Sequence, residues 1–350
     1  MQEMSVMGNK EVTVFGCVMI AGLFSTALVQ AESESAEQVS VTWWGCMSVE
    51  VNIGSTNFVF DPYIQPVEPR FDYIFCSHDH YDHCHEDTLR QLTHPSSEKF
   101  KMLFASRGCF YASRLESPNN WGPTMLNDLN FVPRDKTLAL YPKYRREQDP
   151  LFRGLTEVQA GRLKIEAFHS SEDPHPLKVF NTEVELKFAE LAGMWPKLGY
   201  LVTDTITGRS FAHTGDLHSS FPDMRLMRGK VDILFYPLGK LSPEEKVKMV
   251  DYIRPTVAIP THYRLYEKDF PIPADFLKIG GPVGTDYGKL DKETLRKYCL
   301  GHWYPSPNDP PKEILTQREQ FKPFTRLVEL KAGKRYLLPK DLGTLVGRQR

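Results

Sequence analysis

Four of the six residues from His78 to His83 form a candidate set of metal ligands, namely His78, His80, Asp82 and His83. They follow a short apolar run and precede a segment with helical spacing. Imidazole and carboxylate groups at this density are costly to hold together unless a cation neutralises and orients them. In an extended turn, His78 and His80 point the same way and can bind one ion, while Asp82 and His83 can face a second.

Three later residues complete a candidate two-metal site, and each of them follows a predicted strand: His169, Asp216 and His262. Strands whose carboxyl ends each provide one ligand can converge on one edge of a pair of sheets. Gly215 allows the backbone to pack closely, so that Asp216 can reach between two ions. We expect one ion to bind His78, His80, His169 and Asp216, and the other to bind Asp82, His83, Asp216 and His262. The nearby His175 is the alternative to His169.

The chemistry expected of this residue set is hydrolysis. Two divalent ions about 3.5–4 Å apart lower the pKa of a bridging water, which gives a hydroxide nucleophile, and they polarise a carbonyl or phosphoryl oxygen. Asp82 would orient this hydroxide, and His218 or a metal-bound water would protonate the leaving group. His213 is either a hydrogen-bond donor or proton source beside the metal ligands, or a strand residue packed next to the site. Mixed imidazole and carboxylate ligands suit Zn²⁺, and Mn²⁺ or Fe²⁺ would also fit.

The elements that must position these side chains are mainly strands. Alternating residues predict a β-meander over residues 39–60, and an apolar run over 71–76 predicts the buried strand that leads into the motif. Helical spacing predicts a helix over 86–92, and a Ser cap followed by Pro predicts another over 242–253. Further strands are predicted at residues 163–168, 199–203, 210–213, 231–236, 257–260, 325–330 and 335–338, the last two joined as a closing hairpin.

Two stretches that are rich in Pro and Gly, residues 171–197 and 265–321, lack clear periodicity and are predicted as insertions. Loops of this length inside a compact domain usually carry function. The second insertion starts soon after His262, so we expect it to leave the chain at the metal site and to contact substrate. The alternative is a contact between subunits, because its aromatic residues also favour interfaces.

The first 31 residues have the outline of a secretory signal peptide. The apolar run from Val12 ends in Val29-Gln30-Ala31, which places small residues where a signal peptidase cleaves. A cleaved signal predicts a periplasmic or secreted protein without a stable membrane span. The alternatives are a retained membrane anchor and a buried N-terminal helix.

The rest of the chain has the composition of one globular domain, predicted over residues 39–340. The formal net charge of -1 offers no basic surface for nucleic acid or an anionic membrane, so a small-molecule substrate is expected. The cysteines that follow the signal are odd in number and irregularly spaced, which does not describe a disulfide framework. Cys76 and Cys109 are predicted as buried apolar side chains.

The order of the candidate ligands resembles the metallo-β-lactamase superfamily. The matching segments are His-x-His-x-Asp-His at 78–83, the lone His169, Thr-Gly-Asp at 214–216 and Pro-Thr-His at 260–262. The resemblance covers nearly the whole chain after the signal. Its first motif is similar to the N-acyl phosphatidylethanolamine phospholipase D branch, and its later motifs are similar to the ascorbate-6-phosphate lactonase group. Cys46 stands where those lactonases usually carry His or Asn.

This resemblance implies an α+β fold, an αββα four-layer sandwich with the metals at one edge of the two sheets. It implies a dinuclear hydrolase that cleaves an ester, lactone or phosphodiester bond. Asp216 argues against hydrolysis of β-lactam antibiotics, because the true β-lactamases of the superfamily lack a bridging Asp. The competing hypothesis is a non-catalytic metal-binding protein of the same fold, and the complete ligand set argues against it.

The signal peptide leads to a direct prediction. We expect the mature protein to begin at or near Glu32, because cleavage after Ala31 places small residues at the cleavage site. N-terminal sequencing of protein recovered from its native host should give this start. An intact Met1 on soluble cytosolic protein would contradict the prediction.

Overall fold

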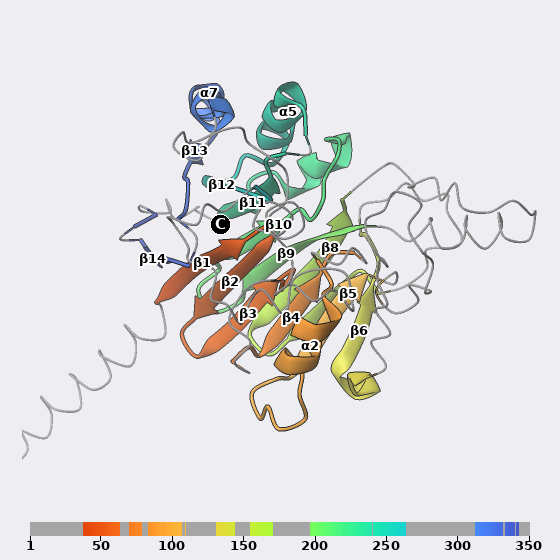
Figure 1. The fold of residues 1–350 in the computed structure, drawn as a ribbon. Coiled ribbons are helices and arrows are strands. Elements are labelled where there is room, and N and C mark those ends of the chain that lie inside the picture. The colour runs from red at the N-terminus through yellow and green to blue at the C-terminus, as the bar shows by residue number, and fades with distance from the viewer. Residues whose placement is uncertain are drawn as a thin grey trace, which may run out of the picture.

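The computed structural model describes most of the chain between residues 38 and 342 (Figure 1). The described residues are 38–63, 70–78, 83–106, 109, 131–143, 155–170, 197–239, 241–263, 312–331, 333–339 and 341–342. The expected signal peptide therefore lies outside the described residues. Within the described ranges, no helix is long and apolar enough to cross a membrane.

Two mixed sheets form the centre of the molecule. Sheet A has the order β14 (Arg335–Leu338), β1 (Val39–Gly45), β2 (Ser48–Ile53), β3 (Thr56–Phe60), β4 (Tyr73–Cys76), β5 (Met102–Ser106), β6 (Thr137–Leu140). Sheet B has the order β13 (Arg326–Leu327), β12 (Val257–Thr261), β11 (Ile233–Pro237), β10 (Ser210–His213), β9 (Leu198–Asp204), β8 (Leu163–His169), β7 (Glu157–Ala160). Each sheet is antiparallel at one side and parallel at the other.

Helices cover the outer faces of both sheets, and this gives the expected αββα layers (Figure 1). On sheet A, the helix α2 (Glu86–Leu92) packs Leu89 and Leu92 against the side chains of β4 and β5 that point outward. On sheet B, α5 (Pro243–Ile253) and α7 (Lys312–Phe321) lie side by side. Two short 3₁₀ helices, η2 (Arg134–Lys136) and η3 (Pro222–Met227), complete the described helices.

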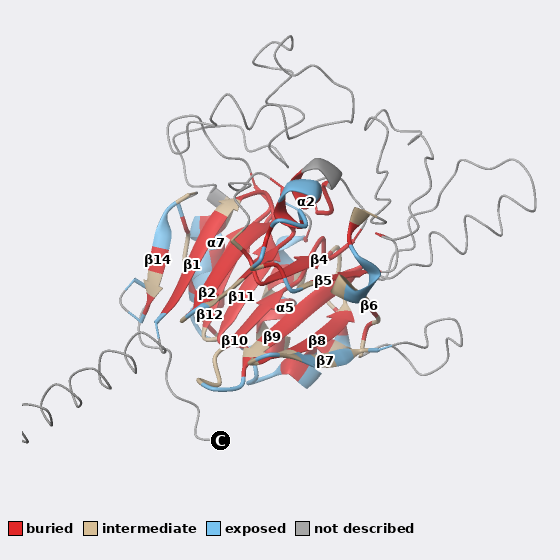
Figure 2. Cartoon of the chain, turned by 90° about the horizontal axis from the view of Figure 1, so that it is seen from below, coloured by how far each residue is buried: buried red, intermediate tan, exposed pale blue. Residues whose placement is uncertain are grey.

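The main core lies between the sheets, where Figure 2 shows buried residues along the strands. Successive residues of β4 alternate between the two cores: Phe75 faces sheet B, whereas Ile74 faces α2. Aromatic rings join the sheets, as Phe58 of β3 contacts Phe211 of β10 with ring centroids 6.0 Å apart. Burial of each such side chain stabilises the fold by about 2–3 kcal/mol. The two sheets are therefore held as one rigid unit.

The parallel halves of the sheets determine where chemistry can occur. In sheet A, β3 and β4 are parallel neighbours, and in sheet B, β10, β11 and β12 are parallel neighbours. The carboxyl ends of parallel strands meet at one edge of a sheet, which is where open α/β sheets bind ligands. The predicted motifs follow these strand ends.

Most of the predicted elements are confirmed, including the β-meander and the helices α2 and α5. Ser242 caps α5 by accepting a hydrogen bond from the Glu245 backbone amide at 3.2 Å, and Pro243 follows it, as predicted. The closing hairpin is wrong, because β13 joins sheet B beside β12 and β14 joins sheet A beside β1. The two strands are neighbours in sequence, but they lie in different layers.

The two predicted insertions fall largely outside the described residues. Of residues 171–197, only Lys197 is described, and it precedes β9. Of residues 265–321, the last ten form helix α7, so this part has regular structure that the prediction lacked. Pro and Gly in the preceding residues hid the helical spacing of this short segment.

The cysteines behave as the sequence predicts. Cys46, Cys76, Cys84 and Cys109 are buried and free of disulfides. Burial raises the pKa of the Cys76 thiol to about 11, and it also raises the pKa of Cys84 well above its ordinary value. Neutral, buried thiols are poor nucleophiles, so these side chains fill the core.

A buried polar network joins α5 and α7 to sheet B. Lys246 of α5 is buried and forms an ion pair with Glu313 of α7. Gln317 donates to Glu313 at 2.9 Å and accepts from the hydroxyl of Tyr236 at 2.6 Å. Burial lowers the pKa of Lys246, while the carboxylate of Glu313 opposes that shift.

This network predicts that replacing either of its two charged residues lowers the free energy of unfolding by a different amount. Glu313→Ala should lower the free energy of unfolding by about 2–3 kcal/mol, because it leaves a buried ammonium without its counter-charge. Lys246→Met should cost less, because a carboxylate that is partly exposed can be hydrated. Urea unfolding of the two variants measures the difference, and equal losses would contradict the role given to Lys246.

Candidate metal centre

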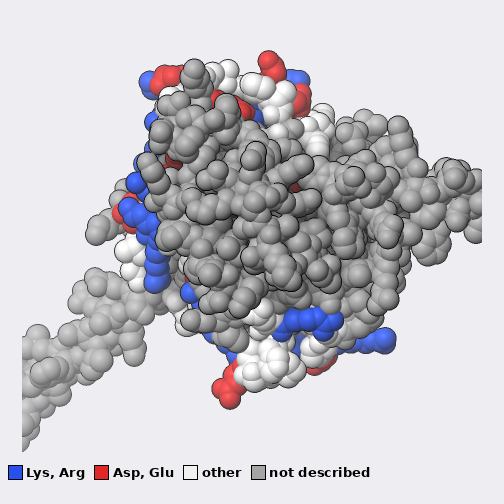
Figure 3. Space-filling model, in the orientation of Figure 1, with Lys and Arg blue, Asp and Glu red and all other residues white. Residues whose placement is uncertain are grey.

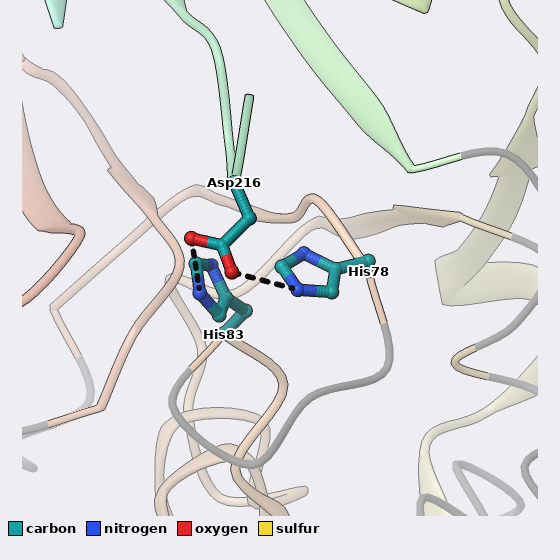
Figure 4. A group of neighbouring side chains, drawn as sticks. All are labelled: His78, His83 and Asp216. Carbon is teal, nitrogen blue, oxygen red and sulfur yellow. Dashed lines mark ion pairs between the residues drawn. The ribbon is translucent and has the colours of Figure 1, made fainter. Parts of the chain in front are cut away.

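One buried carboxylate, Asp216, lies among three imidazole rings at the edge where the sheets meet. Its Oδ2 is 3.7 Å from Nε2 of His78, and its Oδ1 is 3.4 Å from Nε2 of His83 (Figure 4). The same Oδ1 is 3.1 Å from Nε2 of His262. All four residues are at most 2% exposed. Both carboxylate oxygens therefore face imidazole nitrogens in a space closed to bulk water.

The chemistry and spacing of these donors fit a metal ion. Nitrogen and oxygen ligands about 2.1 Å from a tetrahedral zinc ion lie roughly 3.4 Å from one another. The three distances from Asp216 to the imidazole nitrogens range from 3.1 to 3.7 Å. The ligand atoms of His78, His83 and Asp216 all lie within 4.8 Å of one another. These residues can therefore hold a metal ion without rearrangement.

The strand ends bring these residues together from both sheets. His78 and His83 follow β4 of sheet A, whereas Asp216 follows β10 and His262 follows β12 of sheet B. Gly215 makes the close approach possible: its φ is +57°, and a Cβ there would lie 2.8 Å from Cβ of Ser77 and from the Leu198 carbonyl oxygen. The expected close packing at Gly215 is confirmed.

Behind the ligands, a second carboxylate fixes the ring of His83. Asp61 follows β3, and its Oδ2 is 2.7 Å from Nδ1 of His83. Asp61 also accepts hydrogen bonds from the backbone amide and the hydroxyl of Ser77, each at 2.7 Å. Donation from Nδ1 to Asp61 leaves Nε2 of His83 with a lone pair directed at Asp216, as a metal ligand requires.

His213 lies one layer further from the metal centre. Its ring is fully buried and stacks on Phe60 with centroids 4.9 Å apart. Burial holds the pKa of His213 below its ordinary value, against the nearby Asp61 carboxylate, so the neutral ring is favoured. Nε2 then donates to the Met47 carbonyl oxygen at 2.9 Å, and Nδ1 accepts from the Gly215 amide at 3.3 Å. Of the two predicted roles, this arrangement supports the packed residue that steadies its neighbours.

The other predicted site residues either lie outside this group of ligands or are not among the described residues. His80, Asp82 and His175 lie outside the described residues. His169 ends β8, half-buried, with its ring 5.5 Å from Phe221, and it is not in the group of three ligands that lie within 4.8 Å of one another. His218 is half-buried two residues after Asp216. The roles given to these five residues therefore stay predictions.

Asp61 is the site residue that the sequence analysis missed. The sequence analysis gives it no role, although it directly follows the β-meander predicted over residues 39–60. Its φ of 43° is unusual for a residue other than Gly, which indicates that its position is fixed by its contacts. The available signal was its place after a predicted strand, which the candidate ligands His169 and His262 share.

Described charges of both signs lie around the rim of the face in Figure 3, where Lys and Arg occur beside Asp and Glu. This mixture agrees with the net charge of -1.

Comparison with known families decides the classification. A family model described as a beta-lactamase superfamily domain matches residues 40–262, which include every described ligand. The chain belongs to the metallo-β-lactamase superfamily. The resemblance found in the sequence is thereby confirmed, and so is the fold that it implies.

Two relatives are each identical to the chain at about a quarter of the aligned residues. A UPF0173 protein of Pyrococcus abyssi is 26% identical over 65% of this chain and 85% of its own length. A UPF0173 metal-dependent hydrolase of Opitutus terrae is 25% identical over 64% of this chain and 84% of its own length. Among solved structures, CmlA, a diiron beta-hydroxylase of Streptomyces venezuelae, has a TM-score of 0.51 at 13% identity, covering 86% of this chain and 54% of CmlA. That likeness concerns the metallo-β-lactamase fold alone.

The contact between Asp61 and His83 generates a test. Asp61→Asn should weaken binding of Zn²⁺ about 10–100-fold, because the amide no longer holds the ring as a carboxylate does. A competition titration with a chromophoric chelator measures the affinity.

Asp72→Asn provides the matched control. Asp72 is also buried and accepts a backbone hydrogen bond, from Asn57 at 2.9 Å, but it lies at the opposite end of the same strands. Its variant should bind Zn²⁺ as the natural protein does. Equal weakening in both variants would show that general destabilisation, and not the Asp61 contact, lowers the affinity.

Proposed function

We propose that the protein is a metal-dependent hydrolase that uses two divalent ions, most readily Zn²⁺, to cleave an ester, lactone or phosphodiester bond in a small molecule. The observation that carries the proposal is the buried Asp216 carboxylate, which has imidazole nitrogens near both of its oxygens. One carboxylate placed in this way can bind two ions, one through each oxygen. The name of the Opitutus terrae relative, a metal-dependent hydrolase, supports the same reaction class.

The bound ions would supply an activated water and would polarise the substrate oxygen under attack. The residues of the chain hold this chemistry in place. His78 and Asp216 would bind one ion, and His83, Asp216 and His262 would bind the other, with Asp61 fixing the tautomer of His83. His80 and His169 complete the first set in our proposal, and Asp82 completes the second.

Protons must also move during hydrolysis. We assign to Asp82 the acceptance and orientation of the nucleophile's hydrogen, and to His218 the donation of a proton to the leaving group. His218 is suited to this role because it is half-buried, so its ring can exchange protons with solvent, and because it follows Asp216 by two residues.

The proposal predicts that Asp216→Ala loses most of its metal. One carboxylate serves both ions, so its removal should reduce bound zinc from about two equivalents to well under one. Asp232→Ala is the control: Asp232 is a buried carboxylate at the other end of the strands, where it accepts from the Ser210 amide at 2.9 Å. Elemental analysis of both purified variants measures the content. Two equivalents retained in Asp216→Ala would overturn the ligand assignment.

Parallel assays of the metal-loaded natural protein on lactone, phosphodiester and thioester substrates test the reaction class. Turnover of one class that is lost in Asp216→Ala supports the proposal. Full metal content without turnover of any class would favour the non-catalytic metal-binding protein.

A further inference from the structure

The backbone of the ligand His262 is held by the turn between β1 and β2. Its amide donates to the carbonyl oxygen of Cys46 at 2.6 Å. The same carbonyl oxygen accepts a second hydrogen bond, from Nε1 of Trp43 at 3.0 Å. One carbonyl group of this turn thus accepts from the backbone of a candidate metal ligand that follows sheet B, and the indole of Trp43 in β1 donates to the same carbonyl group.

The two residues that flank His262 contact the turn and the strand that leads into it. Before it, the Thr261 hydroxyl lies 3.0 Å from the sulfur of Met47. After it, the Tyr263 ring packs on Trp43 of β1 with centroids 4.4 Å apart. Three consecutive residues, Thr261 to Tyr263, therefore contact either the turn or the end of β1.

The backbone at this junction is unusual on both sides. His262 has a φ of 55° and Cys46 has a φ of 48°, a region that residues other than Gly seldom adopt. Such conformations persist where surrounding contacts determine them, and they concentrate at functional sites. The hydrogen bond from the His262 amide to the Cys46 carbonyl oxygen directly joins these two unusual backbones.

The turn also reaches the other ligand strand of sheet B. The Met47 carbonyl oxygen is 2.9 Å from Nε2 of His213, and Nδ1 of that ring accepts from the Gly215 amide. Gly215 directly precedes the ligand Asp216. A displacement of the turn would therefore act on both ligand segments.

We propose that the turn Gly45–Met47 is a positioning element for the metal centre, in which the Cys46 carbonyl oxygen sets the orientation of His262. The proposal rests on the proposed metal-binding function. The thiol of Cys46 has no part in it, and neither Trp43 nor Cys46 binds metal. The turn acts by holding a ligand at the angle that the ion requires, as outer contacts do in metal sites.

The first test compares two adjacent tryptophans. Trp43→Phe removes the donor to Cys46 but keeps a ring beside Tyr263, whereas Trp44→Phe removes a similar bond, 2.9 Å long, to Glu50. We expect Trp43→Phe to bind Co²⁺ about 10-fold more weakly and to change the visible absorption of the bound ion. Trp44→Phe should match the natural protein in both measurements. Equal behaviour of the two variants would overturn the positioning role.

A second pair of variants keeps the proposal testable if Trp43→Phe does not fold. Cys46→Gly removes the thiol and suits a positive φ, whereas Cys46→Val opposes that φ because its side chain is β-branched. We expect Cys46→Gly to retain Co²⁺ affinity within about threefold and Cys46→Val to lose about 10-fold or more. Equal losses in both would show that the thiol matters, and not the carbonyl.

The natural protein separates this proposal from the one on which it rests. If it fails to bind Co²⁺ or Zn²⁺, the proposed function is wrong. If it binds metal and the variants show no difference, only the positioning role is wrong.

Discussion

The structure depends on the burial of one carboxylate between three imidazole rings. Asp216 is 1% exposed, and a carboxylate removed from water in this way is costly unless positive charge or donors surround it. A neutral imidazole has a lone pair on one nitrogen and a proton on the other. A cation bound by the carboxylate and by the imidazole lone pairs therefore stabilises this buried group better than hydrogen bonds alone. Gly215 and the end of the strand before it allow Asp216 to approach the three imidazole rings closely.

Both sheets contribute ligands to this centre. Side chains from a single strand end are too few and point in too few directions to surround an ion, whereas facing edges supply ligands from opposite sides. The cost is that the sheets must keep a fixed separation. The aromatic core between them provides this, and Asp61 and the turn after β1 connect the two edges next to the ligands.

Local patterns predicted much of this molecule, and contacts between distant segments account for the rest. The motif that contains His78 and His83 and the cap of α5 are local, so they could be read directly. The strands β5, β6 and β7 were missed, because β6 and β7 lie at or near sheet edges and carry weak alternation, and β5 is a short run with few flanking signals. The role of Asp61 and the separation of β13 from β14 depend on which strands are neighbours, which spacing along the chain does not state.

The pairing of β14 with β1 joins the two ends of the described chain, since Val39 lies opposite Leu338. During synthesis the N-terminal strands emerge first, and contacts between residues this far apart form late. Until the final strand is made, β1 presents unpaired backbone amides and carbonyls along an apolar edge, which is a template for aggregation. A nascent chain that stops before Arg335 therefore exposes this edge permanently, so premature termination harms this protein far more than loss of a surface tail would.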